Sequence, residues 1–209
     1  LNNTVFSGNT LYGLSGETSA PTTIFYSDPA GFTLNNSQVL NNTLVNYAAF
    51  LYRDTSTAAT VTNTLFDANN LTGSAYLINN AMTAFSLTSS TFSNSYVTGL
   101  SAMIFIGMSS ALTSNTLTFV NNYFADDGII IAGFQPTSTC TLTNINITKN
   151  VKYVDPSDVR SSARADILIL NKGTMTFSTS KVIESSNLIF STGTLTTNQM
   201  SVQNFFTIN

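Results

Sequence analysis

The chain has 209 residues and a formal net charge of −3; 43% of its residues are hydrophobic and only 8% are charged. This composition excludes a disordered chain, whose signature is low hydropathy with high net charge, and the lack of a basic tract excludes a nucleic-acid binder. The longest apolar runs, 102–108 and 128–134, have the length of strands and are too short for a membrane-spanning helix.

Threonine, serine and asparagine dominate the polar residues, with 33, 26 and 25 copies. Threonine favours strands, and asparagine tolerates left-handed backbone and caps turns with its own side chain. The four prolines and eleven glycines are too few to form every turn, so we expect asparagine to form many of them. This composition predicts an all-β protein with many tight turns.

Along the chain, the predicted elements follow a repeat. Short apolar segments followed by asparagine recur with the anchor residues Phe6, Val39, Phe66, Phe92, Phe119, Ile147, Val182 and Val202. Successive anchors are 33, 27, 26, 27, 28, 35 and 20 residues apart. A second series of apolar runs keeps the same phase, at 23–26, 49–52, 75–78, 103–106, 129–131, 167–170 and 188–190. Two independent markers in one phase indicate tandem repeats.

The repeat length and the residue pattern together predict the fold. Runs such as 140–143 and 175–178 alternate threonine with apolar residues, which is typical of strands with an inner and an outer face. We predict an all-β, right-handed parallel β-helix (solenoid) of about eight coils, with 26–28 residues per central coil and two or three strands per coil. It forms one domain over 1–209, and its hand follows the general rule for parallel crossovers.

The repeat also predicts contacts between coils. Phe66, Phe92 and Phe119 are expected to stack inside the core, because they fall at equivalent positions. Asparagines at equivalent corners are expected to hydrogen-bond from coil to coil and to satisfy the backbone there. Outward threonines are expected to form ladders along the faces of the sheets.

The Phe-x-x-Asn segments at 6–9, 66–69 and 119–122 resemble the repeats of polymorphic outer-membrane proteins, and the coils resemble pectin-lyase-like β-helices. The first family pairs such a segment with Gly-Gly-Ala-hydrophobic, which is degraded here at 73–76 and 100–103. That resemblance implies a β-helix used in surface display and adhesion. The second resemblance implies an alternative, the cleavage of acidic polysaccharides.

Candidate catalytic residues are few. The chain has no histidine, which removes Ser-His-Asp and Cys-His catalysis and most catalytic zinc sites. The only adjacent carboxylates are Asp126 and Asp127, and Asp155 follows one coil later. We therefore predict a non-enzymatic extracellular structural or adhesive module without cofactor or metal. The alternatives are a pectin-lyase-like lyase or hydrolase and a non-catalytic glycan-binding β-helix.

A charged segment stands out between Lys149 and Lys172, with eight of the 17 charged residues. It lengthens its coil, so we predict a loop excursion at about 151–165, and loops that leave a scaffold often carry function. Its candidate ligand or subunit contacts are Asp155, Asp158, Arg160 and Arg164. The alternative is a solvated loop whose charges pair locally.

Further expectations concern modification and partners. Asn-x-Ser/Thr sequons mark candidate N-glycosylation sites at Asn2, Asn35, Asn41, Asn70 and Asn146. The single cysteine, Cys140, is read as a small buried hydrophobe. Neither end shows an amphipathic capping helix, so we predict end-to-end association into a filament, unless neighbouring domains of a longer protein cover the ends. Glycans are a further candidate partner, and the predicted location is extracellular or at the cell surface.

Overall fold

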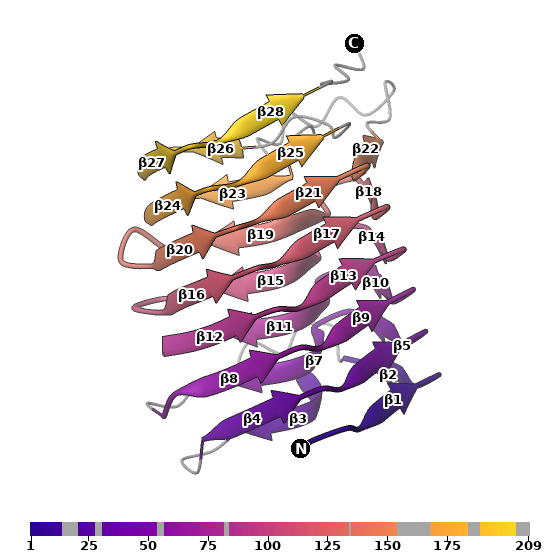
Figure 1. The fold of residues 1–209 in the computed structure, drawn as a ribbon. Coiled ribbons are helices and arrows are strands. Elements are labelled where there is room, and N and C mark those ends of the chain that lie inside the picture. The colour runs from indigo at the N-terminus through magenta and orange to yellow at the C-terminus, as the bar shows by residue number, and fades with distance from the viewer. Residues whose placement is uncertain are drawn as a thin grey trace.

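The computed structural model describes residues 1–13, 21–27, 31–53, 57–81, 84–133, 135–153, 168–183 and 189–203. Over these ranges the chain forms strands and no helix, and every strand pairing is parallel. The protein is a right-handed parallel β-helix, as predicted from the sequence (Figure 1).

The strands form four sheets, numbered here in the order in which the chain visits them within a coil. Sheet 1 consists of β4 (Phe32–Asn35), β8 (Ala59–Thr62), β12 (Ala84–Thr88), β16 (Ala111–Asn115), β20 (Thr139–Thr143), β24 (Thr174–Ser178) and β27 (Thr194–Asn198). Sheet 2 consists of β1 (Val5–Ser7), β5 (Gln38–Leu40), β9 (Leu65–Asp67), β13 (Thr91–Ser93), β17 (Thr118–Val120), β21 (Asn146–Thr148), β25 (Lys181–Ile183) and β28 (Ser201–Gln203). Sheet 3 consists of β2 (Thr10–Tyr12), β6 (Thr43–Val45), β10 (Asn70–Thr72), β14 (Tyr96–Val97), β18 (Tyr123–Ala125) and β22 (Val151–Tyr153). Sheet 4 consists of β3 (Thr22–Ser27), β7 (Ala48–Arg53), β11 (Tyr76–Asn80), β15 (Ala102–Ile106), β19 (Ile129–Gly133), β23 (Ile169–Asn171) and β26 (Ile189–Ser191).

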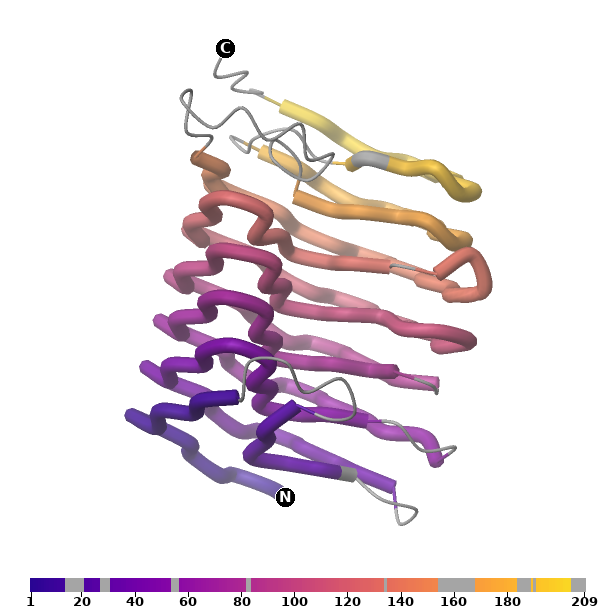
Figure 2. The backbone as a smooth tube through the Cα atoms, turned by 180° about the vertical axis from the view of Figure 1, so that it is seen from behind, coloured from indigo at the N-terminus to yellow at the C-terminus, as the bar shows by residue number. Residues whose placement is uncertain are grey.

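Sheets 1 and 2 together make the front of the solenoid in Figure 1, and sheet 4 lies behind them. The short strands of sheet 3 close one edge, and Figure 2 shows the same stack from behind. The main core lies between these layers and consists of the inward side chains of all the coils. A separate buried cluster, Ala102, Ile129, Ala132 and Leu170, packs with Tyr76 and Phe105 on the outward side of sheet 4.

All eight anchor residues of the repeat fall in one column of sheet 2. The register pairs Phe6 with Val39 and continues without a slip to Val182 and Val202. Within this column the ring of Phe92 stacks on Phe66 at 4.6 Å and on Phe119 at 4.9 Å, with interplanar angles of 2° and 17°. The predicted aromatic stack is therefore confirmed.

Asparagine forms many of the corners, as the composition predicted. Eight of the seventeen non-glycine residues with positive φ among the described residues are asparagines. The first corner, between sheets 1 and 2, is left-handed at Asn36, Asn63, Ser89, Thr116, Asn144, Thr179 and Gln199. At Asn36, Asn63 and Asn144 this turn costs little, because the short polar side chain of asparagine can hydrogen-bond locally in this conformation.

The expectation of two or three strands per coil is wrong, because a central coil contains four. Asn36, Asn41 and Asn46, with φ of 48°, 52° and 44°, turn the chain three times at intervals of five residues. The strands between them, β5 and β6, have three residues each. Among the described residues, no helix is long and apolar enough to cross a membrane.

Candidate binding faces

A buried ladder of side-chain amides lies inside the second corner, between sheets 2 and 3. It consists of Asn42, Asn69, Asn122 and Asn150, with Ser95 between Asn69 and Asn122, and the exposed Asn9 continues it in the first coil. The Nδ2 atoms of Asn42 and Asn122 donate to Asn69 and Asn150 of the next coil at 3.0 and 2.8 Å. Because buried polar groups are costly unless paired, the ladder satisfies the corner backbone and fixes the coils in register.

The outward side of sheet 1 carries only small, uncharged residues. These nineteen outward residues, twelve of them threonine, are Thr33, Asn35, Thr60, Thr62, Ala84, Ser86, Thr88, Ala111, Thr113, Asn115, Thr139, Thr141, Thr143, Thr174, Thr176, Ser178, Thr194, Thr196 and Asn198. We call this surface the threonine face. It includes no aromatic, charged or large aliphatic side chain.

The threonine face is in register across all seven strands of sheet 1. One column runs from Thr33 through Thr60, Ser86, Thr113, Thr141 and Thr176 to Thr196 without an inserted residue. From strand spacing and rise per residue, the face measures roughly 30 Å along the axis and about 13 Å across. Threonine is β-branched, so its hydroxyl and methyl groups are held in few orientations.

Most hydroxyls of this face have no hydrogen-bond partner among the residues that the structure describes. Among its twelve threonines only Thr88 and Thr62 share a side-chain hydrogen bond, with their oxygens 3.2 Å apart. The remaining ten hydroxyls form no hydrogen bond with any described residue, and they project from a surface whose residues are exposed or half-buried. They are therefore available to water or to a ligand.

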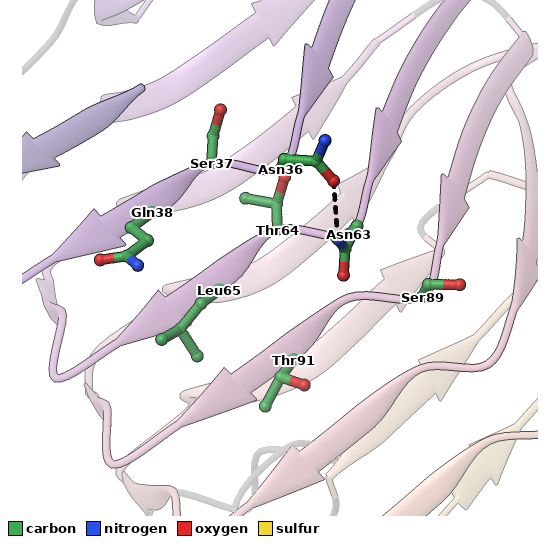
Figure 3. Close-up of a pocket in the computed structure, with 8 residues that line it drawn as sticks. All are labelled: Asn36, Ser37, Gln38, Asn63, Thr64, Leu65, Ser89 and Thr91. Carbon is green, nitrogen blue, oxygen red and sulfur yellow. Dashed lines mark hydrogen bonds between the residues drawn. The ribbon is translucent and has the colours of Figure 1, made fainter. Parts of the chain in front are cut away.

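A shallow groove of about 270 Å³ lies beside the first corner, over three successive coils (Figure 3). Its lining consists of Asn36, Ser37, Gln38, Asn63, Thr64, Leu65, Ser89 and Thr91. Nδ2 of Asn63 donates to Oδ1 of Asn36 at 2.6 Å, and this outer ladder stops where Ser89 replaces asparagine in the next coil. The groove offers amides and hydroxyls but no charge, which suits a neutral polar ligand.

Sheet 3 carries a strip of tyrosines on its outward side. The rings of Tyr96 and Tyr123 stack at 5.2 Å with an interplanar angle of 10°, and Tyr153 lies outward on the next strand. Burial raises the pKa of Tyr123, and Tyr96, Tyr153 and Asp126 raise it further. Tyr96 and Tyr123 therefore each cover one face of the other ring and remain partly exposed.

The adjacent carboxylates lie in the turn that follows β18. Asp126 has a φ of 51° and accepts a hydrogen bond from Thr98 Oγ1 at 2.6 Å. Asp126 is exposed and Asp127 is half-buried. Among the described residues no group of three or more His, Cys, Asp or Glu side chains lies close enough to hold a metal ion.

The four predicted contact residues of the charged loop, Asp155, Asp158, Arg160 and Arg164, lie outside the described residues. The strand β22 occupies the start of that segment, and it alternates in an unexpected way. Val151 and Tyr153 are outward, while Lys152 is inward, only 2% exposed, with its Nζ donating to the carbonyl of Gly128. From the sequence, Lys152 was expected in a loop excursion, either as part of a contact surface or in a solvated loop.

The five sequons differ in exposure. Asn2 and Asn41 are exposed, and Asn41 sits at a left-handed corner. The remaining three, Asn35, Asn70 and Asn146, are half-buried, and Oδ1 of Asn70 is buried without a partner. Asn2 and Asn41 are therefore the sequons whose side chains are best exposed.

Cys140 lies in the main core and is 5% exposed, which confirms its interpretation as a small buried hydrophobe. Burial raises the pKa of its thiol far above the ordinary value. The threonine face was expected only as ladders and was not singled out as a site. Its signal in the sequence is the Thr-x-Thr or Ser-x-Thr pair that precedes several first corners, as at 60–62, 86–88 and 141–143.

Comparisons with known proteins add little to this picture. No protein-family model and no curated protein matches the chain. One solved structure to which it is similar is described as the Streptococcus pneumoniae surface protein and adhesin PfbA. The identity is 7% and the TM-score 0.24, over 97% of this chain and 91% of that chain. A likeness of this size carries no functional conclusion for this protein.

Proposed function

We propose that this chain is a non-catalytic, extracellular structural and adhesive β-solenoid. The observation that carries the proposal is the threonine face, an uncharged surface kept in register over seven strands. A surface of this kind has little to offer acid–base chemistry, which needs titratable groups at defined distances. It has much to offer adhesion, because many weak contacts on a rigid support act together without further ordering.

The test compares adhesion with turnover. The full chain, labelled at its terminal amine, is incubated with a panel of insoluble materials and, separately, with soluble homogalacturonan. We expect retention on at least one solid and no unsaturated or reducing-end product above a blank. Product formation that disappears in Asp127→Ala or Asp126→Ala, but persists in the control Asp67→Ala on sheet 2, would show an enzyme and overturn the proposal.

A second candidate function is glycan binding, which the uncharged groove favours. Neutral sugars present hydroxyls that amides such as Asn63 and Gln38 can pair with. Titration of soluble oligosaccharides followed by chemical-shift changes tests this candidate. Shifts confined to the groove, and abolished by Asn63→Ala, support it; shifts elsewhere or none contradict it.

End-to-end association is proposed as the structural side of the function. Leu195 and Val202 in the last described coil are 39% and 42% exposed, although they pair with the buried Met175 and Val182 of the coil before. Covering such residues stabilises a stack. Sedimentation analysis across a wide concentration range tests the proposal, and a chain that stays monomeric throughout contradicts it.

A further inference from the structure

We propose that the threonine face binds the surface of ice, and that the solid recognised by this solenoid is therefore ordered water. The inference rests on the proposed adhesive function and names its ligand. Threonine is concentrated on the outward side of sheet 1 and not on the outward side of sheet 2, although both sheets belong to the same coils. β-propensity alone would spread threonine over every sheet, but the outward side of sheet 2 includes Leu40, Asp67, Val120, Lys181 and Ile183.

The outward residues of sheet 1 are spaced at regular intervals in two directions. The outward columns of sheet 1 repeat about every 4.8 Å along the axis and about every 6.6 Å across it, since alternate residues of a strand face the same side. Oxygen atoms on planes of hexagonal ice repeat at distances of the same size. A single hydroxyl gains little by exchanging liquid water for ice, because both offer hydrogen bonds. Only a lattice match that extends over many residues adds these small gains together.

The threonine face is also regular and rigid. The register from Thr33 to Thr196 has no insertion, so no position in the column falls out of phase. Successive strands of sheet 1 run nearly parallel to one another in Figure 1. Restricted threonine rotamers and the continuous strand pairing of sheet 1 hold the array before binding, which keeps the entropic cost of binding low.

The threonine face combines unpaired hydroxyls with a lack of charge. Ten of the twelve threonine hydroxyls have no hydrogen bond to a described residue, and each threonine side chain also carries a methyl group. Charged groups would hold their own hydration shells and interrupt an ordered layer of water. The face includes none, although Lys172 and Lys181 lie on the same coils outside it.

Two other occupants fit less well. The face covers roughly 400 Å² on strand spacings, about half of the 800 Å² per partner in a stable protein interface, so a second copy is not favoured. Crystalline polysaccharide is not favoured either, because the face has no aromatic side chain to lie against sugar rings. The tyrosines of this protein are on sheets 3 and 4 or, for Tyr47, at the corner between them, and none is on sheet 1.

The experiment grows ice slowly from a solution of the full chain and measures the fraction of protein that enters the ice. Recrystallisation of fine-grained ice is recorded in parallel. The face variant is Thr113→Lys with Thr141→Lys, two exposed residues that pair directly in the middle of the column. The matched control is Thr118→Lys with Thr148→Lys, which places the same two charges outward on sheet 2 of adjacent coils. Circular dichroism and thermal unfolding verify that all variants fold.

We expect the wild type and the Thr118→Lys, Thr148→Lys control to enter the ice and inhibit recrystallisation. The face variant should lose about tenfold or more in apparent affinity, equivalent to about 1.4 kcal/mol. Exclusion of the wild type from ice, or equal activity of the face variant, overturns the inference. Retention on crystalline cellulose or chitin that depends on Thr113 and Thr141, without ice binding, overturns it while leaving the adhesive function intact. Adhesion to no solid at all contradicts the adhesive function as well.

Discussion

Asn122 and Asn150 lie one coil apart in the buried ladder, and Oδ1 of Asn150 accepts two hydrogen bonds from Asn122. The side-chain Nδ2 of Asn122 donates at 2.8 Å and its backbone nitrogen at 3.2 Å. Oδ1 of Asn122 in turn accepts from the backbone of Ser95, and its Nδ2 also donates to the carbonyl of Phe92. One side chain thus joins three coils.

Asn122→Ala is expected to lower the free energy of unfolding by about 3 kcal/mol, because it leaves several buried polar groups without a partner, at roughly 1–3 kcal/mol for each. Urea unfolding followed by circular dichroism measures the change. The control Asn198→Ala alters an exposed asparagine at the end of the threonine face and should change stability by less than about 0.5 kcal/mol. Equal losses in the two variants would refute the role assigned to the ladder.

Ser95 occupies the ladder position that asparagine holds in the neighbouring coils. Its Oγ accepts from the backbone of Asn69 and donates to the carbonyl of Ser93, but it cannot bridge the amides on either side. Ser95→Asn is expected to raise the free energy of unfolding by about 1 kcal/mol, since the new amide gains hydrogen bonds to Asn69 and Asn122.

The reciprocal change, Asn122→Ser, should cost less than Asn122→Ala, because serine keeps one acceptor at the corner. Both variants are measured by the same urea titration. If Ser95→Asn is destabilised instead, the coil at Ser95 has no room for an amide side chain. The ladder would then be interrupted there for steric reasons.

Cys140 supplies a prediction about pH. Burial raises the pKa of its thiol from an ordinary value of 9.0, so the native thiol stays protonated where the unfolded thiol has lost its proton. The native state therefore binds more protons above this pH, and stability falls as pH rises by up to about 1.4 kcal/mol per unit from this group.

Unfolding in urea between pH 8 and pH 10.5 checks this slope, with Cys140→Ala as the control that removes it. Other groups also ionise in alkali, so the measured quantity is the difference in slope between the two proteins. A thiol reagent at pH 8 gives an independent reading. Native Cys140 should react only as fast as the chain opens, and rapid reaction of the folded protein would contradict its burial.

Much of the fold could be predicted because the repeat carries it. Anchors such as Phe66 and Phe92 are large apolar residues at one phase, and the hydrophobic effect leaves them a single place, inside the core. The number of strands per coil could not be predicted. The corners at Asn36 and Asn41 leave a strand of only three residues, which is too short for alternation to be recognised in a sequence.

The candidate site was harder to predict than the core. Outward threonines in a β protein are expected from strand propensity alone, so their concentration on one sheet becomes visible only when the register assigns each to a face. The orientation of Lys152 could not be predicted either, because its charge indicated a side chain exposed to solvent. Its neighbours Val151 and Tyr153 turn out to face outward, and the pleat then directs Lys152 inward.

Arg53 leads to the last prediction. Its side chain is fully buried on the inward side of sheet 4, in register with Asn80. One guanidinium nitrogen donates to the carbonyl of Thr57, whereas Nε and Nη1 are buried without a partner. Burial lowers the pKa of Arg53, which reflects the cost of keeping this charge away from water.

A buried charge with unsatisfied donors is destabilising relative to an apolar side chain of similar shape. We therefore expect Arg53→Met to raise the free energy of unfolding by about 1–2 kcal/mol, and Arg53→Ala to lower it by about 2 kcal/mol or more because it leaves a cavity. Thermal and urea unfolding of both variants distinguish the cost of the buried charge from the loss of side-chain volume. If Arg53→Met loses as much stability as Arg53→Ala, the guanidinium stabilises the folded chain and the expected cost of its buried charge is contradicted.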